Sequence, residues 1–181
     1  MIAITLPDGS VKQFDAGITP MEVAISISEG FARNVISASF NDTTIESSTP
    51  LIEDGNLILY TWRDTKGKQA FWHSSAHIMA QALEEMFPGI KLTIGPAIEN
   101  GFYYDIDLVN NTISEKDLKP IEDKMLEIAR GKHVFTLRES SKADALEYYR
   151  KQGNEYKVAL IENLEDGTIT FCDHDNFTDL C

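Results

Sequence analysis

Short apolar runs separated by turn residues occupy the first sixty positions of the chain. Apolar and polar residues alternate over residues 2–6, a Pro-Asp-Gly-Ser turn follows at 7–10, and residues 11–14 return as a second run. This pattern predicts a β-hairpin. Two further apolar runs, at residues 35–40 and 57–62, predict two more strands.

The sequence of a helix start lies between the hairpin and these strands. Thr19 is suited to the N-cap, Pro20 to the first helical position, and Glu22 to closing a capping box. We expect the helix to end at Gly30, because glycine is a common helix terminator. One helix packed on a small mixed sheet is the β-grasp arrangement, which we predict for residues 1–64.

Apolar residues disappear over residues 63–68, so we place a domain boundary there and expect a second domain, of α+β class, at residues 65–181. Periodicity, helix starts and glycine stops in this domain predict helices at about 70–87, 114–131 and 141–151, a hairpin turn at 99–101, and strands at 133–137 and 168–171.

The chain is acidic, with 16 Lys and Arg residues against 29 Asp and Glu and a formal net charge of −13. This net negative charge excludes binding of a nucleic-acid backbone over a broad surface of the chain. Binding of nucleic acid would require a small local contact or a covalently attached neighbouring domain. The first ten residues lack the basic region of a signal peptide, and no apolar run is long enough to span a membrane. Two cysteines cannot form a disulfide framework. We therefore expect a cytoplasmic protein with no membrane partner.

Two histidines on the long predicted helix are the first candidates for chemistry. His73 and His77 lie one turn apart, just outside the apolar arc of the helix, so both imidazoles can address one water, metal or ligand. A metalloprotease would need Glu directly after the first histidine, where Ser74 stands instead. The spacing is explained equally well if the two histidines are partly exposed helix residues that have no function.

The last ten residues carry further candidates. Cys172 and His174 share a face if they lie on a strand, and they could complete a four-ligand metal set with the helix histidines. The simpler expectation is a buried Cys172 and an exposed His174. Asp179 and Cys181 are also two positions apart, so they would share a face of a strand.

Two side chains elsewhere have both a structural and a chemical interpretation, and a third has a structural one only. Tyr104 follows the predicted hairpin turn and could donate a phenol hydrogen bond or simply pack in the sheet. Lys157 lies in a mostly apolar stretch, where its ammonium either extends to solvent, the default, or is held near an anion or oxyanion. His133 has no visible partner, and we interpret it as structural.

In combination, several segments resemble the amino-terminal half of bacterial threonyl-tRNA synthetases. The resemblance spans the whole chain and rests on ITLPDGS, TPMEVA, HSSAH, IGPAIENGFYYDID, EYKVALIEN and FTDLC, which occur in the family's order. It implies a TGS domain of β-grasp fold followed by an editing domain that has relatives in the alanyl-tRNA synthetases.

The resemblance also implies an editing pocket. The family's His-x-x-x-His motif matches His73 and His77, and its later Cys-x-x-x-His motif matches Cys181, after which the chain stops. We therefore expect a fragment cut inside that motif. The family's pocket Tyr, Lys and Asp match Tyr104, Lys157 and Asp179, whereas Cys172 and His174 have no counterpart.

By this resemblance the fragment hydrolyses the ester that joins serine to the 3′ end of threonine tRNA and spares threonine. His73 or His77 would hold the attacking water and Lys157 would stabilise the oxyanion. Asp179 would bind the serine amino group, Tyr104 would orient the substrate, and Cys181 would shape the pocket. We expect no metal for editing, although the alanyl-type relatives make zinc bound by His73, His77 and Cys181 a rival.

The remaining expectations concern the complete enzyme, a threonine–tRNA ligase. No ATP-binding signature occurs in these residues, so threonylation with ATP, magnesium and zinc would reside in downstream domains, and the complete enzyme would be a homodimer. Three alternatives remain: a non-catalytic module that binds RNA or protein, a zinc-dependent trans-editing hydrolase of the alanyl type, and an inactive fragment.

Overall fold

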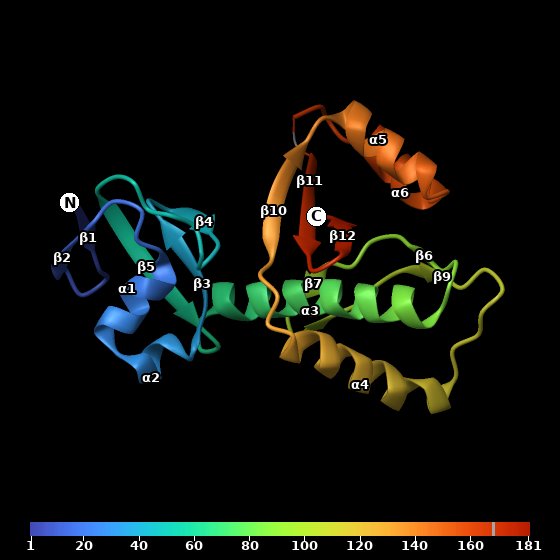
Figure 1. Cartoon of the computed structure of the whole chain (residues 1–181), viewed down its shortest axis with the longest axis horizontal. Helices are drawn as coiled ribbons and strands as arrows, with labels where there is room; N and C mark the ends of the chain where they lie inside the picture. Colours follow the sequence, from blue (N-terminus) through green and yellow to red (C-terminus); the bar gives the residue numbers. More distant parts are fainter. Residues whose placement is uncertain (168) are drawn as a thin grey trace. The chain divides into compact units, whose positions relative to one another are not determined.

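The computed structural model describes residues 1–167 and 169–181, and it divides into two compact units, residues 1–72 and 73–181 (Figure 1). The long helix α3, Thr65–Met86, contributes residues to both units. Its start coincides with the boundary that we predicted at residue 65, but the domain limits themselves stay a prediction. No helix in the described part of the chain is long and apolar enough to cross a membrane.

The first unit is a mixed sheet with a helix packed against it. Strand β1 pairs antiparallel with β2 and parallel with β5, which gives the strand order β2-β1-β5-β3-β4. Val23 of helix α1 is buried in one core with Ile4 and Leu57. The predicted hairpin (β1 Ile2–Thr5 and β2 Val11–Phe14), helix (α1 Pro20–Ile27) and strands (β3 Val35–Phe40 and β5 Gly55–Thr61) are confirmed. The short helix α2, Glu29–Ala32, and the strand β4, Thr43–Ile45, were not predicted.

Helix α1 begins as predicted and ends earlier. Thr19 and Glu22 form the capping box, with the Glu22 amide donating to Thr19 Oγ1 at 3.2 Å and the Thr19 amide donating to Glu22 Oε2 at 2.8 Å. The predicted end at Gly30 is wrong. Ser28 is extended, with φ −169°, and its side chain caps the short helix α2, which contains Gly30.

In the described residues, the second unit combines four helical segments with three small sheets. Strands β10, β11 and β12 form an antiparallel sheet, and β6 pairs with β9 and β7 with β8. The bounds are α4 Glu115–Arg130, α5 Lys142–Lys151, α6 Glu155–Glu162, β6 Lys91–Leu92, β7 Ala97–Ile98, β8 Gly101–Phe102, β9 Ile106–Asp107, β10 Thr136–Ser140, β11 Ile169–His174 and β12 Phe177–Leu180.

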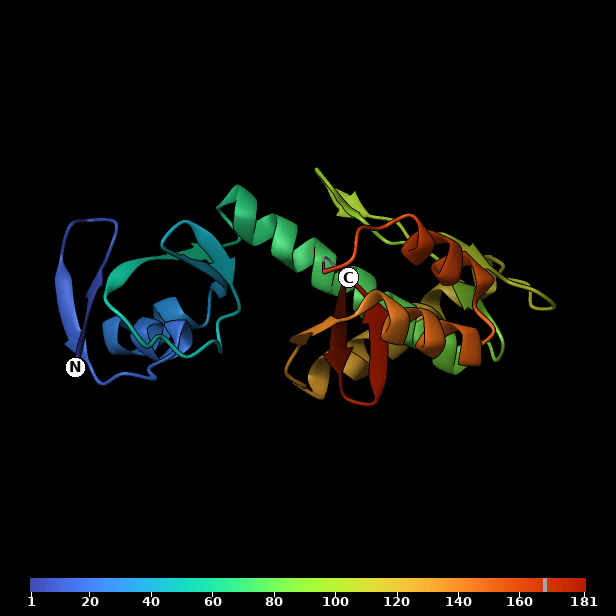
Figure 2. The ribbon, with the colours of Figure 1, turned by 90° about the horizontal axis from the view of Figure 1, so that it is seen from above.

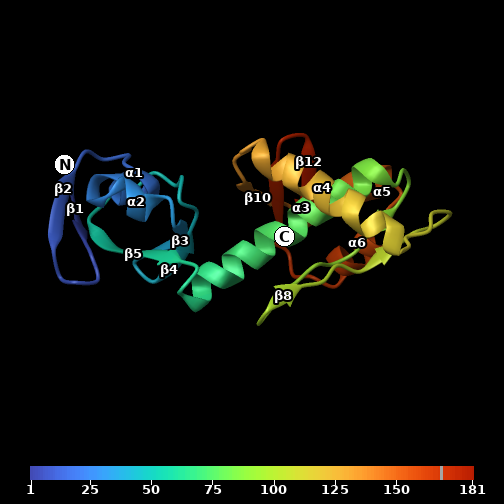
Figure 3. The ribbon, with the colours of Figure 1, turned by 90° about the horizontal axis from the view of Figure 1, so that it is seen from below.

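Two apolar cores hold this unit together. One joins α3 to α4 and β12 through Leu83, Ile121 and Phe177, and α4 accordingly runs alongside α3 (Figure 3). The other joins α5 to α6 and β11 through residues such as Tyr149 and Phe171, and α5 lies beside α6 (Figure 2). These two cores hold α3, α6 and β12 within the second unit.

Most helices of the second unit follow the prediction, whereas the strands β6, β9 and β12 were not predicted. The strand predicted at 133–137 lies at 136–140, and the apolar stretch around residue 157 is the helix α6, which we did not predict. The strand predicted at 168–171 is described from Ile169 to His174, and residue 168 lies outside the described residues. The turn between β7 and β8, at residues 99 and 100, is confirmed.

Candidate catalytic site around two histidines

Helix α3 places His73 and His77 one turn apart, with their Nε2 atoms 3.0 Å from each other. His73 is exposed, in agreement with its predicted place at the edge of the apolar arc. His77 is not at the edge, because only 6% of its surface is exposed. Burial of His77 is a correction to the prediction, and it follows from the strands that cover this part of the helix.

Asp179, on strand β12, joins the side chains of this site. Its carboxylate is fully buried, and Oδ2 accepts hydrogen bonds from His77 Nδ1 at 2.8 Å and from the Tyr104 hydroxyl at 2.6 Å. Oδ1 accepts from Lys157 Nζ and, at 2.9 Å, from the backbone amide of Leu180. A carboxylate has about four lone-pair positions, so that of Asp179 is fully occupied.

Lys157 enters the site from helix α6, whose N-cap Asn154 accepts a hydrogen bond from the Lys157 amide. Its side chain is 2% exposed, so our default expectation that the ammonium extends to solvent is wrong. Nζ pairs with Asp179 and donates to the Tyr104 hydroxyl at 3.4 Å. It also lies 5.2 Å from the centre of the Tyr149 ring, which is a cation–π distance.

Tyr104 lies between β8 and β9, and its ring rests directly on Gly95. A Cβ atom at position 95 would lie 2.1 Å from Cδ2 of the tyrosine. Only glycine therefore permits this ring position, which brings the hydroxyl to Asp179. Sequence reasoning identified Tyr104 but not the supporting role of Gly95.

Cys181 follows strand β12, where its amide donates to the Thr170 carbonyl at 2.8 Å. Its Sγ lies 3.2 Å from His73 Nε2. One potential ligand atom from each of His73, His77 and Cys181 lies within 4.8 Å of the others. The six residues predicted for the site, His73, His77, Tyr104, Lys157, Asp179 and Cys181, thus form one connected cluster.

Charge and burial shift the titration of the cluster. Burial alone lowers the pKa of His77, but the hydrogen bond to Asp179 and its negative charge outweigh burial and raise the pKa well above the usual value. Burial raises the pKa of Asp179, and the stronger effects of His77 and Lys157 hold it below the usual range. Burial and the neighbouring Asp179 charge raise the pKa of Tyr104, which keeps the phenol protonated.

The pKa of the Cys181 thiol is lowered, whereas the pKa of an ordinary buried cysteine is raised. Burial of Cys181 raises its pKa, but hydrogen bonds from His73 and His77 and the electrostatic influence of the two imidazoles outweigh burial and lower the pKa to about 6. Cys181 can therefore carry negative charge near neutral pH.

Cys172 and His174 lie on β11 and do not belong to the metal-ligand cluster found among the described residues. Both are buried, at 4% exposure each, so the expectation of an exposed His174 is wrong. Cys172 stands opposite Asp179 in the sheet. His133, for which the sequence indicated no partner, has its Nδ1 3.7 Å from Asp175 Oδ1.

Comparison with known proteins agrees with the resemblance seen in the motifs. Residues 2–61 match the TGS domain family. All 181 residues align with threonine–tRNA ligases, at 70% identity for Flavobacterium johnsoniae, 66% for Flavobacterium psychrophilum and 50% for Cytophaga hutchinsonii. The chain spans 28% of the length of each. Over its whole length the chain is therefore similar to part of the threonine–tRNA ligases of these bacteria, and its first sixty residues include a TGS domain.

Proposed function

We propose that residues 73–181 hydrolyse the ester bond between serine and threonine tRNA while sparing threonine. The observation that carries this proposal is the buried chain of hydrogen bonds from Lys157 through Asp179 to His77 and His73, which ends at an exposed imidazole. A synthetic site built for threonine gains only about 1–3 kcal/mol from the methyl group that serine lacks. A separate hydrolytic site supplies the missing selectivity.

We propose that His73 accepts a proton from the attacking water at Nδ1, while its Nε2–H donates to the Cys181 thiolate. His77 is buried and uses both ring nitrogens, one with Asp179 and one with His73. His73 is exposed, so water and an ester can reach it. General base catalysis of this kind contributes about 10²–10⁴ in rate.

Asp179 has no acceptor position left for the serine amino group, so we propose that it positions His77 and Lys157 rather than binding the substrate directly. Lys157 has three N–H donors, of which Asp179 and Tyr104 take two. The third is the donor that we propose stabilises the oxygen that becomes negative in the transition state. Tyr104 and Cys181 remain our proposed contributors to the substrate pocket.

A zinc-dependent version of the same hydrolysis is the second candidate, and the spacing of three ligand atoms favours it. Tetrahedral zinc with bonds of about 2.0 Å to nitrogen and 2.3 Å to sulfur separates its ligand atoms by roughly 3.3–3.5 Å. The observed separations are 3.0 Å between the two Nε2 atoms and 3.2 Å between His73 Nε2 and Cys181 Sγ. These three residues would hold the ion, which would polarise the ester carbonyl or activate a bound water.

The deciding experiment follows release of the amino acid from threonine tRNA charged with serine and, separately, with threonine. It uses this chain and, in parallel, a full-length synthetase that contains it. Serine release well above the spontaneous rate, with little release of threonine, supports the proposal. Equal rates on both substrates with either protein contradict the selectivity, and no release above the spontaneous rate with either contradicts the hydrolysis.

A further inference from the structure

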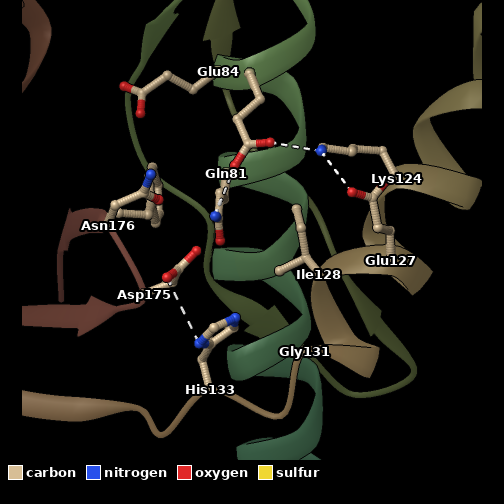
Figure 4. Close-up of a pocket in the computed structure, with 11 residues that line it drawn as sticks. Gln81, Glu84, Lys124, Glu127, Ile128, Gly131, His133, Asp175 and Asn176 are labelled. Atoms are coloured by element: carbon tan, nitrogen blue, oxygen red, sulfur yellow. Dashed lines mark hydrogen bonds and ion pairs between the residues drawn. The ribbon is translucent and has the colours of Figure 1, made fainter.

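A pocket of about 550 Å³ lies in the second unit between α3, α4 and the turn that joins β11 to β12 (Figure 4). None of its lining residues belongs to the candidate catalytic cluster. Three elements distant in sequence form its walls, and the side chains labelled in Figure 4 include Gln81, Glu84, Lys124, Glu127, Ile128, His133, Asp175 and Asn176.

The lining of this pocket is strongly acidic, with four carboxylates and one lysine. Lys124 Nζ satisfies two of the carboxylates, lying 2.8 Å from Glu85 Oε2 and 3.3 Å from Glu127 Oε1. Glu84 has no hydrogen-bond or ion-pair partner among the described residues. Asp175 has only His133 Nδ1, at 3.7 Å, which is too far for a hydrogen bond. Among the described residues, Asp175 therefore has only this long ion pair, and Glu84 has no ion-pair partner at the pocket.

Gln81 provides an independent observation. The residue is 2% exposed, and its Nε2 donates to Glu85 Oε1 at 2.8 Å. Its Oε1 is buried and accepts no hydrogen bond from the described residues. Exchanging the amide oxygen and nitrogen of Gln81 by rotation would not give Oε1 a donor, because Oε1 would then face the Glu85 carboxylate. In Figure 4 the side-chain amide of Gln81 is drawn on the side of the pocket where Asp175 and His133 lie.

An unsatisfied buried acceptor is unfavourable, and native proteins rarely retain one without a reason. The occupant that suits this pocket donates hydrogen bonds and carries positive charge, since the lining repels anions. The partly buried setting, with Ile128 and Phe177 as apolar walls, favours the planar and weakly hydrated guanidinium over a strongly hydrated ammonium.

We propose that this pocket binds a guanidinium group, with Gln81 Oε1, Glu84 and Asp175 as its acceptors. Both an arginine side chain of a protein segment and a small free guanidine compound have this chemistry. The proposal does not rest on the hydrolysis proposed above, because the two sites share no residue.

The test is a titration of the 181-residue chain with N-acetyl-arginine methylamide, followed through the side-chain amide signals of Gln81 in a nitrogen-15 correlation spectrum. The neutral isostere N-acetyl-citrulline methylamide and the lysine analogue are the comparison ligands. We expect saturable shifts with the arginine probe and at least tenfold weaker binding of the other two. Equal binding of arginine and citrulline, or tighter binding of lysine, overturns the proposal.

Titration with agmatine distinguishes the two sources of the group. Tighter binding of agmatine than of the arginine probe identifies a small free ligand, and the reverse order identifies a protein side chain. Either order is consistent with a guanidinium pocket, whereas failure of both compounds to bind contradicts it.

Two variants test the acceptors. Gln81→Met removes the amide at similar volume, and Asp175→Asn keeps a residue that tolerates the left-handed backbone at this position, φ 53°. We expect each to weaken binding of the arginine probe about fivefold or more. Asp42→Asn is the matched control, since Asp42 also has positive φ, at 66°, and lies in the other unit. Unchanged binding in the folded Asp175→Asn variant contradicts the proposal even if Gln81→Met fails to fold.

Discussion

His77 Nδ1 lies 2.8 Å from Oδ2 of Asp179, although the two residues are 102 positions apart in the chain. The hydrogen bond crosses from the middle of helix α3 to strand β12, and both side chains are buried. It directs the other ring nitrogen of His77 towards His73. The bond thus connects the interior of the second unit to the exposed imidazole at which we propose hydrolysis takes place.

Asp179→Asn should strongly destabilise the second unit. The substitution keeps the shape of the side chain but leaves the Lys157 ammonium buried without a countercharge. Loss of one partner of a buried ion pair costs about 3–5 kcal/mol, which urea denaturation can measure. Asp173→Asn, on the preceding strand, removes a partly exposed pair with Arg138 and should cost less than about 1 kcal/mol. Equal effects of the two substitutions would contradict this view of Asp179.

Adding Lys157→Met to Asp179→Asn should recover part of the lost stability. Removing the second charge eliminates the unpaired ammonium, and methionine fills the same space. The double variant should therefore be more stable towards urea than Asp179→Asn alone. A fully additive loss in the double variant would show that the two residues do not stabilise the fold as a pair.

His73→Ala and His77→Ala should separate catalysis from stability. His73 is exposed, so its removal should slow serine release by about 10²-fold or more and change the free energy of unfolding by less than about 0.5 kcal/mol. Removal of the buried His77 should slow release and also cost about 1–3 kcal/mol, because Asp179 loses a donor. His133→Ala, at a half-exposed histidine in the same unit, is the control. Undiminished serine release in both variants would remove the pair from the mechanism.

Gly95→Ala should displace Tyr104. The added methyl would overlap the tyrosine ring, so the ring must move and its hydrogen bond to Asp179 must lengthen or break. We expect a loss of about 1–3 kcal/mol in urea denaturation together with slower serine release. Gly30→Ala is the matched control, because its new Cβ would meet only Ser28 Oγ at an ordinary 3.5 Å. Similar results for the two variants would show that Tyr104 does not need this close contact.

Removal of metal distinguishes the two mechanisms. The metal-free mechanism predicts that serine release survives dialysis against a chelator and that elemental analysis finds no stoichiometric zinc. The zinc-dependent alternative predicts loss of release on chelation, recovery with added zinc, and loss of bound zinc in His73→Ala. His133→Ala should retain whatever zinc the unsubstituted chain binds.

Elements that depend on a few neighbouring residues were predictable from the chain alone. The hairpin of β1 and β2, the capping box of Thr19 and Glu22, and the contact between His73 and His77 all follow from spacing within one turn or one strand pair. The end of α1 was missed, because Ser28 is a helix stop only in the extended conformation that the fold imposes on it. Helix α6 was missed as well, since its apolar residues show no clear helical period.

The candidate site was partly visible in the same way. Motif resemblance identified all six of its residues, but no pattern near Lys157 or His174 indicates that these side chains are buried. The support that Gly95 gives to Tyr104 was equally invisible, since it depends on a contact between backbone and ring.

The local elements, the family resemblance and the residue types available for chemistry were all visible in the chain, because each depends on residues close together in sequence. Which of these side chains lose contact with water, and which atoms meet, depends on the packing of distant segments. Asp179 can hold Tyr104, Lys157 and His77 together because α3, α6, β12 and the segment after β8 pack into one unit. Burial and hydrogen bonding depend on what covers a residue, and here the covering segments lie far away in the chain.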